Sequence, residues 1–249
     1  MARCSSFLQN LLCIFSNGYL LDYCLSYRVF YGKSKAKNTK DFRKESFRPT
    51  SIDNEINVLD KVGTEKNWAK RKGIVLKNVY YNMEELIAEA KNPAIGTSLA
   101  VFKPKEVLDF VWEECDREWD AKKLETVYAN QAQQSLFDLE ETKRIFHIVK
   151  KLPYEFSYKF TSEDGKIRKL MIEDWELGML YWNCLESSNG DEQLACQKVK
   201  EKYFNEMCSK KDIHFFLGTT KKFHNVGPNP FIIIGTFYPP IDNQLSLNL

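Results

Sequence analysis

Residues 154–172 contain two runs in which apolar and polar side chains alternate, YEFSYKF and IRKLMI, joined through Asp164-Gly165. Alternation with a period of two is typical of strands that bury one face, and Asp-Gly between two such runs is a strong hairpin signal. We therefore predict an antiparallel hairpin here. The pattern changes directly after residue 172, which predicts the start of a helix at that point.

The rest of the C-terminal half alternates between the two kinds of periodicity. A period near 3.6 predicts helices over 174–187 and 191–208, and strand-like runs follow at 213–220 and 230–238. The last two strands are joined by a loop of about ten residues, which is too short for a parallel crossover and favours antiparallel pairing. We predict an α+β fold in which the hairpin and these strands form one mostly antiparallel sheet, with helices packed on one face.

Three further patterns concern single elements. Asn82, followed three positions later by Glu85, is typical of a helix N-terminus. The run at 96–104 predicts a buried strand, and 139–149 predicts a helix.

The helix predicted over 174–187 is rich in large apolar side chains. Trp175, Met179 and Trp182 recur at a spacing of three to four residues. This spacing places them on one stripe of the helix, so we predict that they face the core and not a ligand.

Composition narrows the class of protein. The 249 residues are 43% apolar and include 17 Phe, 12 Tyr and 5 Trp, which is enough for a sizeable core. The net charge of +2 does not by itself indicate a nucleic-acid or membrane partner. Seven cysteines, an odd number without a CxxC pair, are typical of reduced thiols, so we predict a cytoplasmic protein.

The apolar N-terminal segment suggests a signal peptide or membrane anchor as an alternative. Gln9, Asn10, Asn17 and Asp22 interrupt it, so no run reaches the roughly 18 apolar residues of a spanning helix. We predict an element packed on the body of the protein and no membrane association.

A basic run separates this segment from the remainder. We divide the chain into an N-terminal segment with a basic linker, 1–50, and an α+β domain, 51–249. A cationic run can neutralise phosphates with little sequence preference, whereas its alternative role is that of a solvated linker. The cations are Lys33, Lys35, Lys37, Lys40, Arg43, Lys44 and Arg48.

The loop between the last two strands combines hydroxyls, cations, a histidine and the aromatic Phe223. These groups can hold a phosphate and stack on a base, although an ordinary exposed hairpin loop has the same composition. The residues that we predict to bind nucleic acid are Thr219, Thr220, Lys221, Lys222, His224, Arg43 and Arg48.

Three carboxylates, Glu173, Asp174 and Glu176, stand where a predicted strand meets a predicted helix. They are candidate catalytic residues, because a magnesium-dependent nuclease needs oxygen ligands at such a place. Helix capping is the alternative and the commoner role. Convergence with Lys166 or Lys169 would favour an enzyme.

The histidines do not predict a metal site. His147, His214 and His224 are dispersed and no cysteine pair accompanies them. The residues select no cofactor and no oligomeric state, and they leave open whether the protein is an enzyme.

The following blocks occur in order over roughly residues 41–240: FRKESFRP, GTSLAVFKPKEVLDFVWEE, QQSLF, LPYEFSYKF with IEDWELGMLYWNC, FFLGTTKKFH and NPFIIIGTFYPP. Taken together, they resemble a family of uncharacterised proteins found in archaea and bacteria. The resemblance implies a fold and no activity. Members often begin with a β-rich segment resembling a nucleic-acid-binding small barrel, which residues 1–30 do not match. Related sequences carry cysteines and a histidine in the hairpin, where TSEDGKIRKL has neither.

The sequence thus favours a function in nucleic-acid binding or processing. The alternatives are a metal-dependent, nuclease-like hydrolase built on the three carboxylates, and a non-catalytic interaction module.

Overall fold

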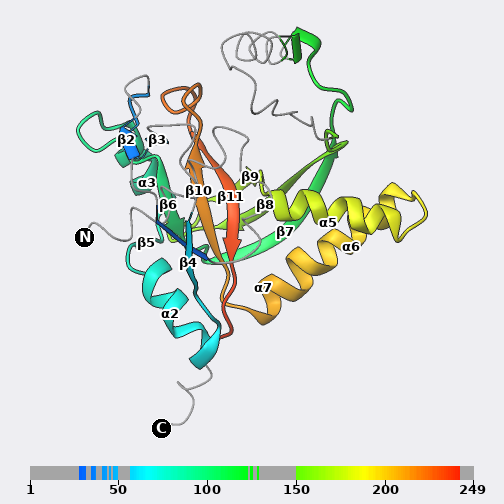
Figure 1. The fold of residues 1–249 in the computed structure, drawn as a ribbon, viewed down its shortest axis with the longest axis horizontal. Coiled ribbons are helices and arrows are strands. Elements are labelled where there is room, and N and C mark those ends of the chain that lie inside the picture. The colour runs from blue at the N-terminus through cyan, green and yellow to red at the C-terminus, as the bar shows by residue number, and fades with distance from the viewer. Residues whose placement is uncertain are drawn as a thin grey trace. The chain divides into compact units, whose positions relative to one another are not determined.

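The computed structural model describes residues 28–31, 35–37, 41–43, 45, 47–49, 57–122, 124–125, 128 and 150–241. The chain divides into two units (Figure 1). One contains Met1–Val111 together with Phe156–Leu249, and the other contains Trp112–Glu155.

A four-stranded sheet lies at the centre of the larger unit. Its order is β11 (Phe231–Phe237), β10 (His214–Thr219), β6 (Leu99–Phe102) and β5 (Val79–Tyr80). β10 pairs antiparallel with both of its neighbours, whereas β5 and β6 run parallel. The predicted antiparallel pairing of the last two strands is confirmed, and so is the predicted strand at 96–104.

A three-stranded sheet has the order β7 (Glu106–Glu114), β8 (Tyr154–Thr161) and β9 (Ile167–Met171). β8 and β9 pair antiparallel, which confirms the predicted hairpin. Gly165 in its turn has a φ of +73°, a conformation that glycine adopts without the steric cost of a Cβ atom.

The α+β class is confirmed, but the prediction of a single sheet is wrong. The hairpin and the final strands belong to different sheets, which meet through one isolated bridge between Ile172 and Ile233. The Glu173 amide also donates to the Ile233 carbonyl oxygen at 2.7 Å. Helix α5 is capped by Asp174, so too few extended residues remain after β9 for a longer pairing with β11.

Aromatic side chains from the two sheets pack against each other. Tyr158 of β8 stacks on Phe215 of β10 with ring centroids 5.1 Å apart. Phe160 meets Phe215 and Phe102 edge-on, at 5.3 and 5.7 Å. All four rings are fully buried, and such pairs stabilise a core by about 0.5–1.5 kcal/mol each beyond the burial of their area. These contacts make the interface between the sheets the core of the larger unit.

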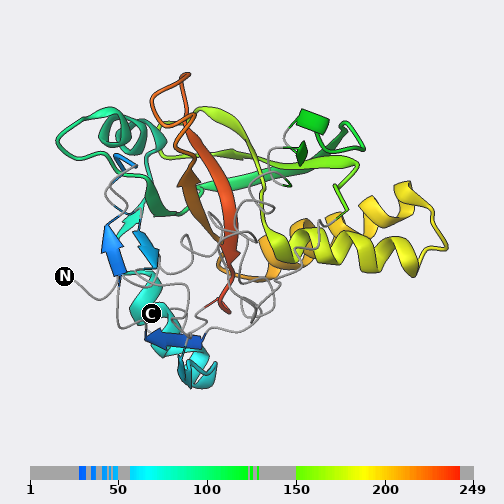
Figure 2. The same ribbon diagram turned by 45° about the horizontal axis from the view of Figure 1, so that its top comes forward.

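The predicted C-terminal helices form one antiparallel pair. α5 (Trp175–Glu186) is followed by α6 (Glu192–Lys200), which continues through a π-helix, η1 (Glu201–Glu206), into α7 (Met207–Lys210). Figures 1 and 2 both show α5 and α6 side by side.

The predicted inward stripe of α5 is wrong. Leu177 and Tyr181, four residues apart, are buried, and Tyr181 packs against an aromatic ring of β8. Met179 is 38% exposed, and Trp175 and Trp182 are only half-buried. α5 is apolar on several faces, and Met179 lies two residues from each buried side chain and therefore on the opposite side of the helix.

Helix α2 (Glu65–Val75) packs on the four-stranded sheet. Val75 joins a buried cluster with Phe216 and Phe237, and the Trp68 ring lies 5.7 Å from that of Phe237.

Helix α3 (Met83–Lys91) begins where the sequence predicts. The Asn82 side chain accepts a hydrogen bond from the Glu84 amide at 3.0 Å and donates one to Glu85 at 3.3 Å. The predicted N-cap is therefore confirmed. The helix predicted over 139–149 lies outside the described residues.

For strands β1 to β4, the structure describes the backbone. β1 (Arg28–Tyr31) pairs antiparallel with β4 (Asn57–Lys61), and β2 (Lys35–Lys37) pairs antiparallel with β3 (Phe47–Pro49). The division of the chain at residue 50 stays a prediction.

The smaller unit has its own local contacts. The Cys115 amide donates to the Pro153 carbonyl at 3.0 Å, and its thiol donates to the Leu152 carbonyl at 3.3 Å.

Candidate functional site

The loop between β10 and β11 begins with a tight turn. The amides of Phe223 and His224 both donate to the carbonyl oxygen of Thr220, at 3.1 and 2.9 Å. The Val226 amide donates in turn to the Phe223 carbonyl at 3.0 Å. The loop therefore has a defined backbone conformation that presents consecutive side chains in different directions.

His224 and Thr219 anchor this loop from beneath. His224 is buried, and its Nε2 lies 3.0 Å from the Ala90 carbonyl oxygen at the end of α3. Since a carbonyl only accepts, Nε2 carries the proton, and Nδ1 accepts a hydrogen bond from the buried Thr219 hydroxyl at 2.7 Å. The sequence predicts that both side chains bind a phosphate. In the structure both are buried, and they hold the loop in position.

Arg43 has a similar supporting position. Its guanidinium pairs with the Asp41 carboxylate, with an Nη2–Oδ2 distance of 2.6 Å, and Nη1 donates to the Thr219 carbonyl oxygen. Both charged side chains are buried. Arg43 therefore ties the basic segment to the end of β10 and does not present its charge to solvent. Arg48 lies in β3, opposite Ala36, and only its backbone is described.

The loop exposes Thr220, Lys221, Lys222 and Phe223 before the buried His224, and residues 225–228 after it. The Phe223 ring is 50% exposed, and the Lys222 ammonium lies 5.0 Å from its centroid. Phe42, which is 53% exposed, meets the His224 ring edge-on at 5.3 Å. Sequence reasoning missed Phe42, although an aromatic residue inside a basic run is the signal that could have identified it.

The carboxylate candidates lie at the start of α5. Asp174 is the N-cap of the helix and its Oδ1 accepts from the Glu176 amide at 3.0 Å, which confirms the capping role. Its Oδ2 accepts a longer hydrogen bond, 3.4 Å, from the Tyr203 hydroxyl of η1. Glu173 and Glu176 are exposed.

The π-helix positions Tyr203 for this contact. Its carbonyl oxygen accepts hydrogen bonds from the Tyr158 hydroxyl at 2.6 Å and from the Cys208 thiol at 3.2 Å. Short π-helical segments within helices are frequent at functional sites. Here the segment directs a buried phenol toward the Asp174 carboxylate.

The electrostatics of Asp174 are unusual for an aspartate. Burial, and to a smaller extent the charge of Glu176, raise the pKa of Asp174 to about 7. Desolvation by neighbouring protein atoms also raises the pKa of Glu176, although its side chain reaches the surface and the nearby Lys202 opposes the shift. Burial raises the pKa of Tyr238. A carboxyl group that titrates near neutral pH can serve as an acid or a base.

Lys166 does not join these carboxylates. Its ammonium pairs with Glu84 of α3 at 2.9 Å. Lys169 lies in β9 opposite Lys159. Lys166 therefore does not converge with the three carboxylates, as a metal-dependent enzyme would have required.

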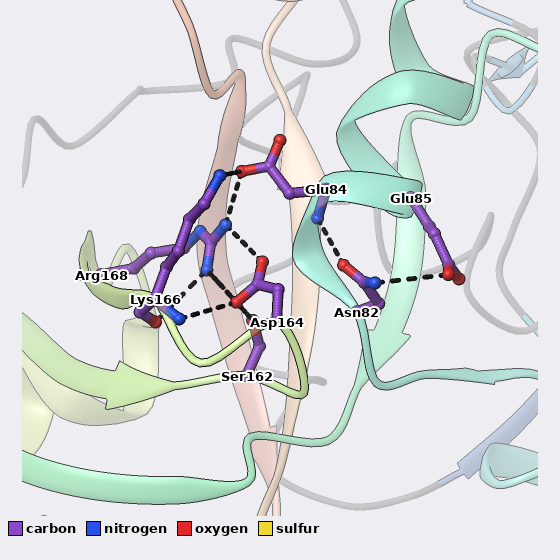
Figure 3. A network of polar contacts seen from close by, with 7 residues as sticks. All are labelled: Asn82, Glu84, Glu85, Ser162, Asp164, Lys166 and Arg168. Carbon is purple, nitrogen blue, oxygen red and sulfur yellow. Dashed lines mark hydrogen bonds and ion pairs between the residues drawn. The ribbon is translucent and has the colours of Figure 1, made fainter.

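Lys166 instead belongs to a polar network that connects the hairpin with α3 (Figure 3). Arg168 is its centre: Nη2 pairs with Asp164 at 2.6 Å and with Glu84 at 2.7 Å, and Nη1 donates to Ser162 at 3.0 Å. Hydrogen bonds from Arg168 hold the pKa of Asp164 well below its usual range. The charges are mutually satisfied, so this network stabilises the turn.

The described residues contain neither a cluster of metal ligands nor a helix that could cross a membrane. No group of three or more His, Cys, Asp or Glu side chains in that part of the chain is arranged to hold a metal ion. None of its helices is both long and apolar enough to span a membrane.

Residues 79–249 match the model of a protein family described as a domain of unknown function, DUF8757. The chain belongs to this family. The DUF8757 match includes β5 to β11, the carboxylates and the loop, and it begins after Phe42 and Arg43. No curated protein and no solved structure matches the chain significantly. The match agrees with the expectation of a family without an assigned function, and the description of the family names no activity.

Proposed function

We propose that this DUF8757 protein binds nucleic acid through the loop between β10 and β11. One observation carries the proposal: the anchored turn exposes Lys221 and Lys222 beside the half-exposed ring of Phe223. Two cations next to an aromatic surface match a phosphate and its attached base.

The anchoring supports this function energetically. Binding costs free energy when a loop must first be ordered, and a preorganised loop avoids much of that cost. The buried side chains of His224, Thr219 and Arg43 order this loop before any ligand arrives.

The basic segment is joined to the loop at one described residue. The contact between Arg43 and Thr219 connects residues 41–43 to the base of the loop. Lysines that contact phosphates release counterions from the nucleic acid, so the association constant falls as salt rises.

A titration by fluorescence anisotropy tests this proposal. The probes are labelled single- and double-stranded DNA and RNA at about 50 and 200 mM salt, a range over which phosphate-driven binding weakens strongly. Lys221→Glu with Lys222→Glu should abolish most binding and reduce the salt dependence of what remains. The matched control is Lys210→Glu with Lys211→Glu, an equal charge change at another exposed lysine pair.

Equal loss in the two double variants would show that the loop is not the interface. No binding by the parent protein at low salt would reject the proposal and leave the non-catalytic interaction module.

Asp174 favours hydrolysis as a second candidate function. A carboxyl group with a pKa of about 7 can donate or accept a proton at neutral pH, as a general acid or base must. Glu173→Gln with Asp174→Asn should leave nucleic-acid binding intact and remove any cleavage, measured with and without magnesium. Absence of cleavage by the parent protein under both conditions would reject this candidate.

A further inference from the structure

Two half-exposed aromatic rings are each linked to His224, Phe42 through a ring contact and Phe223 as its neighbour in the chain. Phe42 and Phe223 are 53% and 50% exposed. Phenylalanine has no polar atom that gains from contact with water, so exposure of a ring leaves apolar area unburied, which is unfavourable. A single exposed ring is ordinary, whereas two that share a buried support indicate a surface for a flat partner.

His224 is that shared support. The Phe42 ring meets the imidazole at an interplanar angle of 65° with centroids 5.3 Å apart, and Phe223 precedes His224 in the turn. Hydrogen bonds from Thr219 and to Ala90 fix the imidazole. The segments that carry the two rings are therefore attached to one rigid point, although they are distant in the sequence.

The charges beside the rings restrict the kind of partner. The ammonium group of Lys222 lies 5.0 Å from the Phe223 centroid, and Lys221 is its exposed neighbour. A neutral apolar peptide would gain nothing from these cations. A flexible anionic chain whose flat rings alternate with phosphates would use both groups at once.

We propose that the surface formed by Phe42, Lys221, Lys222 and Phe223 binds single-stranded nucleic acid, with unpaired bases stacked on the two phenylalanine rings. This inference rests on the proposed function and adds a substrate class to it. Bases inside a duplex are stacked on their neighbours, so their faces cannot reach a protein side chain without being unpaired first. Stacking accepts every base, so we expect little sequence preference.

The test compares four labelled probes by fluorescence anisotropy: single-stranded DNA, single-stranded RNA, the matching DNA duplex, and an abasic DNA strand of equal length. The abasic strand retains every phosphate and lacks the bases. The parent protein should bind both single strands more tightly than the duplex and the abasic strand. Phe223→Ala and Phe42→Ala should each weaken binding of the single strands about 5- to 150-fold, which corresponds to the loss of one stacked base.

The same variants should bind the abasic strand as the parent does, because its phosphates still meet both lysines. Phe223→Tyr and Phe42→Tyr retain a ring and should keep most of the affinity, which distinguishes stacking from a general disturbance of the loop. A thermal unfolding curve confirms that each variant is folded. Equal affinity of the parent for single strand, duplex and abasic strand would overturn the inference while the proposed function stands.

Absence of binding to all four probes at low salt would overturn both. Anionic phospholipid vesicles provide a further arm. Binding of vesicles that depends on Phe223, without affinity for the oligonucleotides, would overturn the inference in favour of a membrane surface.

Discussion

The guanidinium of Arg43 donates a hydrogen bond to the carbonyl oxygen of Thr219, a residue 176 positions further along the chain. This contact joins residues 41–43 of the basic segment to the end of β10, where the predicted nucleic-acid-binding loop begins. Their proximity depends on a buried ion pair between Arg43 and Asp41.

We expect Arg43→Ala to destabilise the protein by about 3–5 kcal/mol, because it removes the guanidinium that compensates the buried Asp41 carboxylate. The Asp41→Ala, Arg43→Ala double variant should be less destabilised than the sum of the single variants. Urea unfolding of the four proteins measures the coupling. Strict additivity would contradict a direct interaction between the two side chains.

His224→Ala removes two buried hydrogen bonds and leaves the Ala90 carbonyl and the Thr219 hydroxyl without this partner. The expected loss is about 1–3 kcal/mol in the free energy of unfolding. Val226→Ala, in the same loop but 59% exposed, should change stability by no more than about 0.5 kcal/mol. Similar unfolding midpoints for His224→Ala and the parent would show that the imidazole does not anchor the loop.

Asp174 should give the protein an unusual dependence of stability on pH. Its pKa is about 7 in the folded protein and near 3.8 ordinarily, so between these values the folded state binds a proton that the unfolded state releases. The free energy of unfolding should therefore be higher near pH 4 than near pH 7, by an amount attributable to this residue. Each pKa unit between the folded and unfolded states corresponds to about 1.4 kcal/mol in the free energy of unfolding. Solvent screening of the partly exposed carboxyl group reduces the total, so we expect a difference of about 1–3 kcal/mol.

The check is denaturant unfolding across this pH range for the parent protein and for Asp174→Asn. The amide cannot ionise, so the variant should lack this contribution while retaining a helix cap. Parallel pH profiles for the two proteins would rule out an elevated pKa at Asp174.

Arg168→Lys should destabilise the hairpin by about 1–3 kcal/mol, because an ammonium cannot reproduce the forked contacts with Asp164 and Glu84. Since Arg168 depresses the pKa of Asp164, the stability that this pair supplies is present above the ordinary aspartate pKa and is lost as the pH falls. Acid unfolding of the variant should begin at a higher pH than in the parent. Lys166→Ala, at an exposed pair, is the control and should cost about 0–1 kcal/mol.

Tyr181→Ala and Met179→Ala distinguish the two faces of α5. Tyr181 is fully buried, so its truncation should cost about 3–5 kcal/mol, whereas Met179 is 38% exposed and should cost about 1 kcal/mol or less. Thermal or urea unfolding measures the loss of stability in each variant. A larger loss for Met179→Ala would mean that the helix turns its other face to the sheet.

Local patterns predicted the local elements. Alternation and Asp164-Gly165 predicted the hairpin, and Asn82 predicted the start of α3. The assignment of strands to two sheets was not predictable in this way. It depends on the aromatic contacts between Tyr158 and Phe215, which join distant parts of the chain and leave no periodic signal.

The prediction of the candidate site was limited in the same way, by contacts between distant parts of the chain. Phe223 and His224 are neighbours in the sequence, yet one ring is half-exposed and the other is buried. Which of them points inward is decided by the Ala90 carbonyl at the end of α3, an acceptor that composition does not reveal. Likewise, Arg43 belongs to a basic run, but its burial follows from Asp41, two residues away.

The position of β10 between β6 and β11 determines when the four-stranded sheet can form during synthesis. A nascent chain acquires the β8–β9 hairpin from contacts within about twenty residues, but β6 has no antiparallel neighbour until His214–Thr219 have left the ribosome. The apolar strand Leu99–Phe102 thus lacks this neighbour while residues 103–213 are synthesised, and during that time it is exposed to chaperones and to other nascent chains. The loop that follows β10 acquires its anchor on α3 only after this strand has been synthesised.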